Sequence, residues 1–355
     1  MGFTQKISFV FVDFFHGFYE CFCKSNIYQH PRFLRRSVVY IIIEDSYESF
    51  SASPYSAHIV SIISLIQKGS HSVMKPYAIG LYEKAIPGDF SFRDKLICAK
   101  ECGYDFLEIS IDETDAKLSR LDWSAEERLQ LVNTMKEVGL PIRSMCLSGH
   151  RKYPFGDPDP AVRARSLEIM EKAVILADDL GVRIIQLAGY DVYYKEGTEE
   201  TRKLFEENLA KATAMAACRG IVLGFETMET PFMNTTEKSM YYVNKINSPW
   251  LGVYPDSGNL TNASLDYGTT VPDDLETGRG HIFALHLKET VPGKFREIPF
   301  LTGHVDFDAV VKKAWELGIR RFVTEMWYVG QDSWKEDIKF ANRSMSAVID
   351  KYANA

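Results

Sequence analysis

A repeating unit that runs through most of the chain limits its fold more than any other feature. Each copy has an amphipathic helix, then a glycine, then a short apolar strand. Glycine closes a helix well because it takes the left-handed backbone conformation without steric cost. The helices of this pattern are predicted at residues 91–102, 124–138, 160–180, 199–219 and 305–317, and the closing glycines are Gly103, Gly139, Gly181, Gly220 and Gly318.

The strands of this pattern predict a closed barrel. They are expected at eight segments: 77–82, 105–111, 142–147, 183–188, 221–226, 251–255, 282–287 and 321–325. Eight strands that alternate with helices are typical of a (β/α)8 TIM barrel. The competing fold, a doubly wound open sheet, usually has a glycine-rich phosphate loop after its first strand. The corresponding residues here are Tyr82-Glu-Lys-Ala-Ile-Pro-Gly, so the barrel is favoured.

Residues 1–73 do not follow the pattern. They contain two apolar runs, 9–15 and 38–43, without regular alternation of strands and helices. The first run is short, is interrupted by Asp13 and precedes no small-residue cleavage site, unlike a signal peptide. We expect an N-terminal extension at 1–73 and a barrel domain at 74–355. Met74 opens the first regular strand, so we interpret the extension as a translated leader before a mis-assigned start. An accessory element packed on the barrel is the alternative.

Composition excludes several classes of partner. Hydrophobic residues make up 46% of the chain and charged residues 25%, as in ordinary soluble proteins. The formal charge of -7 argues against a nucleic-acid partner, which usually requires a basic surface. No apolar run is long enough to span a bilayer. The six cysteines are scattered without a C-x-x-C pair, which indicates reduced thiols and a cytoplasmic location.

Four successive strands each end in a side chain that can bind a metal. The residues are Glu226, Asp256, His286 and Glu325. Because the carboxyl ends of barrel strands surround one pocket, we expect these side chains to meet there. Three carboxylates and one imidazole suit one divalent ion, with Mn²⁺, Mg²⁺ or Co²⁺ favoured and Zn²⁺ also compatible.

Each of these residues also has an ordinary structural interpretation. Asp256 could start a turn at Ser257-Gly-Asn, and His286 could be a core histidine. His281 competes with His286, but it begins its strand and would therefore lie at the floor of the barrel. The coincidence of four such side chains at equivalent strand ends favours the metal site.

Several segments give the chain a specific resemblance to a known family. They are Ile79-Gly-Leu-Tyr-Glu-Lys-Ala, Ser110-Ile-Asp-Glu-Thr-Asp, Leu118-Ser-Arg-Leu-Asp-Trp, Ser144-Met-Cys-Leu-Ser-Gly-His-Arg, Ile185-Gln-Leu-Ala-Gly-Tyr-Asp-Val-Tyr-Tyr, Tyr254-Pro-Asp-Ser-Gly-Asn and Glu325-Met-Trp. Over residues 77 to 350 the chain resembles the xylose-isomerase-like barrels, and within them the L-ribulose-5-phosphate 3-epimerases, also called L-xylulose-5-phosphate 3-epimerases. The resemblance places the family's metal ligands at the same four residues. It departs from the related free-ketohexose epimerases at Asn259, where those enzymes have a histidine.

The resemblance implies metal-dependent epimerisation at C3 of a ketopentose 5-phosphate. The reaction would interconvert L-ribulose 5-phosphate and L-xylulose 5-phosphate in the breakdown of L-ascorbate and pentoses. Removal of the C3 proton gives an enediolate, and epimerisation needs a base on one face and an acid on the other. Glu226 and Glu325 come from different strands and are the candidates for this pair.

Three other functions remain open. The first alternative is an aldose–ketose isomerase on the same scaffold, which only the family resemblance separates from an epimerase. An abasic-site endonuclease of this superfamily would need a histidine-rich site with three metals, whereas the barrel contains only His150, His281, His286 and His304. A non-enzymatic sugar-binding barrel would not need four ligands around one metal.

The sequence also offers candidates for the substrate contacts. The candidates are His150, Arg151, Glu229, Asn259 and Lys288, with Lys294 and Arg296 as further cations for the phosphate. For each of these cations, an ordinary surface charge explains the residue about as well as a phosphate contact does. Tyr82 and Trp327 could form an apolar wall or pack the rim. The expected partner is a small sugar phosphate, and a homodimer is an open expectation.

Overall fold

The computed structural model describes residues 8–12, 38–42 and 75–354. The chain divides into two compact units, Met1–Met74 and Lys75–Ala355. In the first unit, β1 (Ser8–Val12) pairs with β2 (Val38–Ile42) as an antiparallel ladder. The remainder of the predicted extension lies outside the described residues, so its interpretation as a translated leader stays a prediction.

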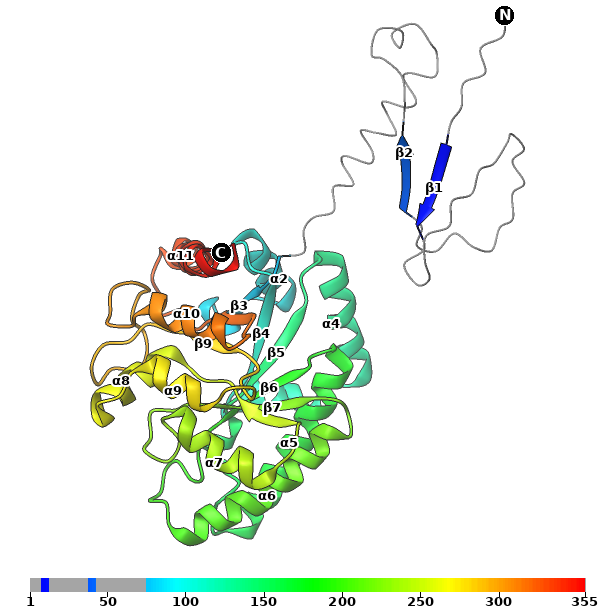
Figure 1. Ribbon diagram of the computed structural model, residues 1–355. Helices are drawn as coiled ribbons and strands as arrows, with labels where there is room; N and C mark the ends of the chain where they lie inside the picture. Colours follow the sequence, from blue (N-terminus) through cyan, green and yellow to red (C-terminus); the bar gives the residue numbers. More distant parts are fainter. Residues whose placement is uncertain (1–7, 13–37, 43–74, 355) are drawn as a thin grey trace, which may run out of the picture. The chain divides into compact units, whose positions relative to one another are not determined.

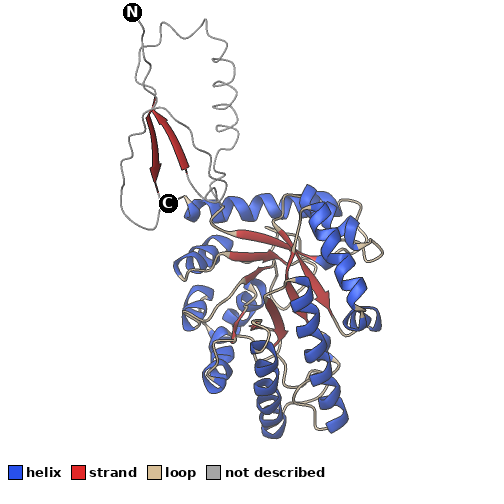
Figure 2. Ribbon diagram, turned by 90° about the vertical axis from the view of Figure 1, so that its right-hand side faces the viewer, coloured by secondary structure: helices blue, strands red, loops and turns tan. Residues whose placement is uncertain are grey.

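The second unit is a (β/α)8 barrel, as predicted. Helices surround a sheet of eight parallel strands (Figures 1 and 2). Every predicted strand segment contains one observed strand: β3 (Ala78–Tyr82), β4 (Phe106–Ile111), β5 (Ile142–Leu147), β6 (Ile184–Ala188), β7 (Val222–Glu226), β8 (Leu251–Val253), β9 (Leu285–Leu287) and β10 (Arg321–Thr324). The last strand, β10, pairs with both β9 and the first strand, β3.

Helices follow the strands as the sequence pattern predicts. The α-helices are α2 (Phe92–Glu101), α3 (Asp115–Leu118), α4 (Ala125–Val138), α5 (Pro160–Leu180), α6 (Glu199–Ala217), α7 (Thr236–Ile246), α8 (Ser257–Tyr267), α9 (Val271–Thr277), α10 (Phe307–Glu316) and α11 (Trp334–Ala353). Short 3-10 helices are η2 (Glu83–Ala85), η3 (Ser119–Asp122) and η4 (Gly149–Arg151). The five predicted closing glycines all have positive φ angles, between 65° and 88°.

The barrel closes irregularly between β8 and β9. These strands are shorter than the predicted 251–255 and 282–287, and two isolated bridges join them, Val253 to Ile282 and Asp256 to His286. Pro255 explains part of the irregularity, because proline has no N–H to donate to a ladder. Its carbonyl oxygen still accepts from His286 N at 2.9 Å. The closure therefore brings Asp256 and His286 together.

Alternate strand residues pack on opposite sides of the sheet. Tyr82, Phe106 and Tyr254 belong to a small cluster inside the barrel, whereas Ile79 and Leu107 belong to the larger core beneath the helices. Gly80 makes room for the Phe106 ring, because a Cβ atom there would lie 2.3 Å from it. No helix in the described ranges is long and apolar enough to cross a membrane.

Candidate metal and substrate site

The four predicted metal ligands meet at the carboxyl end of the barrel. Glu226 ends β7, Asp256 follows β8, His286 lies in β9 and Glu325 follows β10. Each residue offers one ligand atom, and these atoms all lie within 4.8 Å of one another. All four side chains are buried.

Two carboxylate oxygens in this cluster support the fit of a cation. Among the described residues, neither Oδ2 of Asp256 nor Oε2 of Glu325 has a hydrogen-bond partner, although His286 and Lys288 lie within ion-pair distance of Glu325 Oε2. The other oxygen of Asp256 is engaged, because Oδ1 accepts from Asn259 N at 2.7 Å and thereby caps α8. Asp256 therefore caps a helix, where the sequence suggested the start of a turn, and it is also a candidate ligand. A buried oxygen without a partner is costly, and a divalent cation would satisfy both oxygens. The hard oxygen donors and the imidazole fit such an ion.

The imidazole of His286 faces the carboxylates with one nitrogen. Nδ1 lies 3.2 Å from Glu325 Oε2, 3.8 Å from Glu226 Oε1 and 3.9 Å from Asp256 Oδ2. The other nitrogen, Nε2, lies 2.7 Å from Oε1 of Glu108. Burial lowers the pKa of His286, but Glu108 and Glu325 outweigh it and raise that pKa well above its ordinary value.

The carboxyl groups of the cluster differ in their affinity for protons. Burial and the neighbouring Glu325 raise the pKa of Glu226 to about 8. Burial also raises the pKa of Asp256 to about 6, against the opposing effect of Lys288. Burial acts in the same direction on Glu325, but Lys288 and His286 outweigh it and hold its pKa well below the ordinary range. The three buried carboxyl groups thus share the positive charges of His286 and Lys288, and a metal ion would add further positive charge to the site.

Lys288 is part of this cluster. Its Nζ atom lies 3.0 Å from Asp256 Oδ1 and 3.4 Å from Glu325 Oε2, and it donates to Asn259 Oδ1 at 2.8 Å. The amide nitrogen of Asn259 donates to the carbonyl oxygen of Thr227 at 2.7 Å. The polar groups of both predicted substrate residues are therefore already engaged inside the site.

A pocket opens above the cluster. It is lined by Tyr82, Lys84, Cys146, Ser148, Arg151, Glu226, Met228, Glu229, Asn259, Lys288, Arg296, Glu325 and Trp327. Glu226 and Glu325 are the two predicted ligands that reach its wall, whereas Asp256 and His286 do not line it. The pocket also includes the predicted wall residues Tyr82 and Trp327.

Glu229 and two arginines form one side of the pocket. Glu229 accepts from Tyr190 at 2.8 Å, Tyr193 at 3.2 Å and Arg296 at 3.1 Å. The guanidinium of Arg151 lies 4.9 Å from the centre of the Tyr193 ring. Arg151 is less strongly paired than Arg296: its Nη1 lies 3.7 Å from Glu113 Oε1, and its buried Nε has no partner among the described residues.

Two predicted phosphate contacts do not reach this pocket. His150 is buried against Phe155, with ring centroids 4.3 Å apart, and its Nε2 lies 3.1 Å from the carbonyl oxygen of Ser166. Burial lowers its pKa to about 4, so this imidazole is neutral and supplies no positive charge near pH 7. Lys294 is exposed and does not line the pocket. The 3-10 helix η4 turns the His150 side chain toward Phe155 and away from the pocket.

The sequence interpretation missed the residues that support His286. Glu108 contacts one of its nitrogens, and Gln186 Nε2 lies 3.2 Å from the other. The available signal was a polar residue in the middle of an apolar strand, as in Phe106-Leu-Glu-Ile and Ile184-Ile-Gln-Leu. A buried charge needs a partner, so such a residue indicates one on a neighbouring strand.

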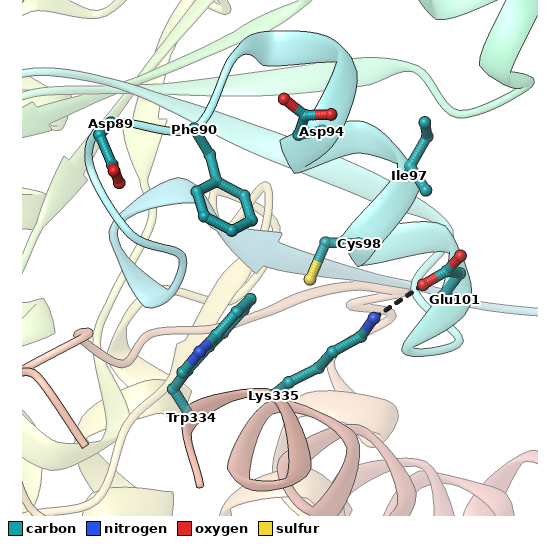
Figure 3. Close-up of a pocket in the computed structure, with 8 residues that line it drawn as sticks. All are labelled: Asp89, Phe90, Asp94, Ile97, Cys98, Glu101, Trp334 and Lys335. Atoms are coloured by element: carbon teal, nitrogen blue, oxygen red, sulfur yellow. Dashed lines mark hydrogen bonds and ion pairs between the residues drawn. The ribbon is translucent and has the colours of Figure 1, made fainter. Parts of the chain in front are cut away.

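A second hollow lies away from these groups, between α2 and the start of α11. Figure 3 shows Phe90, Cys98 and Trp334 around it, with an ion pair between Lys335 and Glu101 at 2.8 Å. Its lining includes none of the four candidate ligands. Two of the candidate ligands, Glu226 and Glu325, line the pocket at the barrel mouth instead.

Solved structures support the fold. The chain is similar to D-allulose 3-epimerase from Methylomonas sp., with 19% identity, a TM-score of 0.63 and coverage of 78% of this chain and 98% of that chain. It is also similar to a structure of an L-ribulose 3-epimerase, with 17% identity, a TM-score of 0.64 and coverage of 78% and 96% of the two chains. At these identities the likeness concerns the fold.

Sequence relatives identify the family. The model of the xylose isomerase-like TIM barrel family matches residues 98–344. L-ribulose-5-phosphate 3-epimerase UlaE proteins from Escherichia coli and Shigella sonnei are each 46% identical over 254 residues, which is 71% of this chain and 88% of theirs. The chain therefore belongs to the xylose isomerase-like TIM barrel family and, within it, to the L-ribulose-5-phosphate 3-epimerases.

Proposed function

We propose that this protein is a metal-dependent 3-epimerase that interconverts L-ribulose 5-phosphate and L-xylulose 5-phosphate. The observation that carries the proposal is that Glu226 and Glu325 both reach the pocket from the ligand cluster. The names of the relatives that are 46% identical support the choice of substrate. The expected setting is the breakdown of L-ascorbate and pentoses.

Glu226, Asp256, His286 and Glu325 would hold one divalent ion. When bound, the ion would act as a Lewis acid toward the oxygens of the substrate. Asp256 and His286 are withdrawn from the pocket, which suits purely structural ligands.

Glu226 and Glu325 would carry out the proton transfers. They come from β7 and from the end of β10, with Asp256 and His286 between them in the barrel order. A substrate seated in the pocket would have one glutamate on each side of C3. One would remove the proton while the other returns a proton to the opposite face, and their roles would exchange with direction. Tyr82 and Trp327 would limit access of water to the reacting carbon from the pocket wall.

Arg151 is the strongest candidate for the phosphate. Its guanidinium lines the pocket and is paired only at 3.7 Å, whereas Arg296 contacts Glu229 at 3.1 Å. Lys84 also lines the pocket, but it pairs with Asp112 at 2.5 Å. A guanidinium can bind a phosphate with two parallel hydrogen bonds. The sugar hydroxyls would then face Glu229 and the metal cluster.

A direct assay tests this proposal. The protein is stripped with a chelator, reloaded with Mn²⁺ or Co²⁺ and incubated with L-ribulose 5-phosphate, and the product is identified by NMR. We expect L-xylulose 5-phosphate, and no product without metal. Free L-ribulose is the matched control for the phosphate, and Arg151→Met should raise KM for the phosphorylated sugar much more than for the free sugar. Formation of an aldose instead would support the aldose–ketose isomerase, and absence of turnover with every divalent metal would refute the proposal.

A further inference from the structure

We propose that Glu108 is the positioning residue of the metal site: it orients the imidazole of His286 so that Nδ1 points at the metal. This inference rests on the metal site of the proposed function, but it concerns a residue outside the four ligands. Glu108 lies in the middle of β4 and is fully buried. It does not line the pocket, so it would act through His286 and not on the substrate.

Both oxygens of Glu108 are fixed. Oε1 lies 2.7 Å from His286 Nε2. Oε2 accepts from the Ser144 hydroxyl at 2.6 Å and from the Tyr254 hydroxyl at 2.9 Å. Hydroxyl donors from two other strand segments thus prevent the carboxylate from rotating away from the imidazole. A residue that only filled space in the core would not need its carboxylate to be held by contacts on both oxygens.

The contact determines which nitrogen is available to a metal. A carboxylate accepts hydrogen bonds and cannot donate them when ionised, so Nε2 of His286 must carry a hydrogen. The lone pair used for coordination is then on Nδ1, which is the nitrogen that faces Glu226, Asp256 and Glu325. The Tyr254 ring also packs edge-on against the His286 ring, with centroids 5.0 Å apart and an angle of 73° between the planes.

Support of this kind has a measurable effect on metal binding. Carboxylates that accept from a ligating histidine fix its tautomer, and their loss typically costs roughly 10- to 100-fold in metal affinity. We expect Glu108→Gln to weaken Mn²⁺ and Co²⁺ binding within this range. Ser144→Ala and Tyr254→Phe each remove one of the two hydroxyl donors and should cause smaller losses.

The experiment measures metal affinity on the full chain, independently of turnover. Mn²⁺ binding is followed by the EPR signal of the free ion, and Co²⁺ binding by calorimetry. Glu229→Gln is the matched control, because Glu229 is a pocket carboxylate that contacts Tyr190, Tyr193 and Arg296 but none of the ligands. Its metal affinity should equal that of the wild type. If Glu108→Gln does not fold, the graded losses in Ser144→Ala and Tyr254→Phe carry the test.

A second measurement separates positioning from general destabilisation. In ¹⁵N-labelled protein loaded with diamagnetic Zn²⁺, we expect the imidazole of His286 to carry its hydrogen on Nε2. Unchanged affinity in Glu108→Gln, Ser144→Ala and Tyr254→Phe, or a hydrogen on Nδ1 in the wild type, would overturn the inference.

The outcomes for the two proposals are distinct. Metal binding that depends on Glu108 in a protein without epimerase activity would refute the proposed function and leave this inference standing. Epimerase activity in a protein whose metal binding does not depend on Glu108 would overturn this inference and leave the proposed function standing.

Discussion

The ammonium group of Lys288 lies 3.0 Å from Oδ1 of Asp256, inside the cluster of candidate metal ligands. Both side chains are almost completely buried. Burial lowers the pKa of Lys288, but Asp256 and Glu325 outweigh it and raise that pKa above its ordinary value, so the lysine stays charged. It therefore supplies a fixed positive charge to a site that contains three carboxyl groups.

Removal of this lysine should destabilise the protein most when no metal is bound. Breaking a buried ion pair by removing one partner typically costs about 3–5 kcal/mol. We expect Lys288→Met to lose an amount of this order in the chelator-treated protein and to regain part of it with Mn²⁺, which would neutralise the same carboxylates. Denaturant unfolding with and without metal measures both values. Lys294→Met, at an exposed position, is the control. An equal loss with and without metal would contradict this explanation.

The metal ligands should be removable without loss of the fold. Asp256→Asn and His286→Ala should each strip the metal, because their atoms end at the barrel mouth and the apolar core lies beneath the helices. Metal analysis after dialysis and circular dichroism check the two parts of this prediction. Asp266→Asn and His281→Ala change exposed residues of the same kinds and should retain the metal. Full metal occupancy in both ligand variants would rule out the proposed site.

Glu83 should stabilise the fold through a buried ion cluster. Its carboxylate contacts Lys95 at 2.9 Å, Lys117 at 2.5 Å and Arg120 at 2.6 Å. Burial raises its pKa, but these cations outweigh burial and hold the pKa well below the ordinary range. Glu83→Gln should therefore cost about 3–5 kcal/mol at neutral pH.

The pH dependence of this effect has a definite sign. Because the pKa of Glu83 is lower in the folded state, its contribution is complete above the unfolded pKa of about 4.3 and is lost as pH falls below it. The difference in free energy of unfolding between the wild type and Glu83→Gln should thus be constant from about pH 5 to 7. It should shrink as the pH falls through the unfolded pKa of about 4.3. Urea unfolding across this range measures the difference. Glu101→Gln, at an exposed ion pair with Lys335, should have little effect. A difference that grows on acidification would contradict the assignment.

Residues 1–73 should be dispensable. All eight barrel strands lie between Ala78 and Thr324, so the sheet needs no strand from the extension. We expect a protein that starts at Met74 to keep the melting temperature and the epimerase activity of the full chain. A large loss of either would show that the extension is a structural part of the enzyme.

The sequence predicted the barrel because its signal is local and repeated. Helix, glycine and strand recur at short range, and the glycines take the expected backbone conformation. The four ligand candidates could be identified because each lies at or close to the carboxyl end of a strand, and the carboxyl ends of all barrel strands lie at the same end of the barrel. What could not be predicted depends on contacts between distant strands. Glu108 and His286 are 178 residues apart, so their contact required the structure.

Two substrate candidates from the sequence, His150 and Lys288, have side-chain partners that only the structure reveals. The chain direction after β5 placed His150 near the barrel mouth, but η4 turns it toward Phe155. Lys288 does line the pocket, yet its charge is used by Asp256 and Asn259. Sequence identifies the residue types near a site, whereas the side-chain partners depend on the tertiary packing.

The position of hydrogen exchange during turnover tests the central claim most directly. The enzyme is incubated with L-ribulose 5-phosphate in heavy water, and the product is examined by NMR. Glu226→Gln and Glu325→Gln, which keep the size of the side chains, should each lose about a hundredfold or more in rate. One of them could still exchange deuterium into the substrate without forming product, which would identify the base on that face. We predict deuterium at C3 of the product. Deuterium at C1 or C2 with none at C3, or near-normal rates in both variants, would contradict the epimerase mechanism.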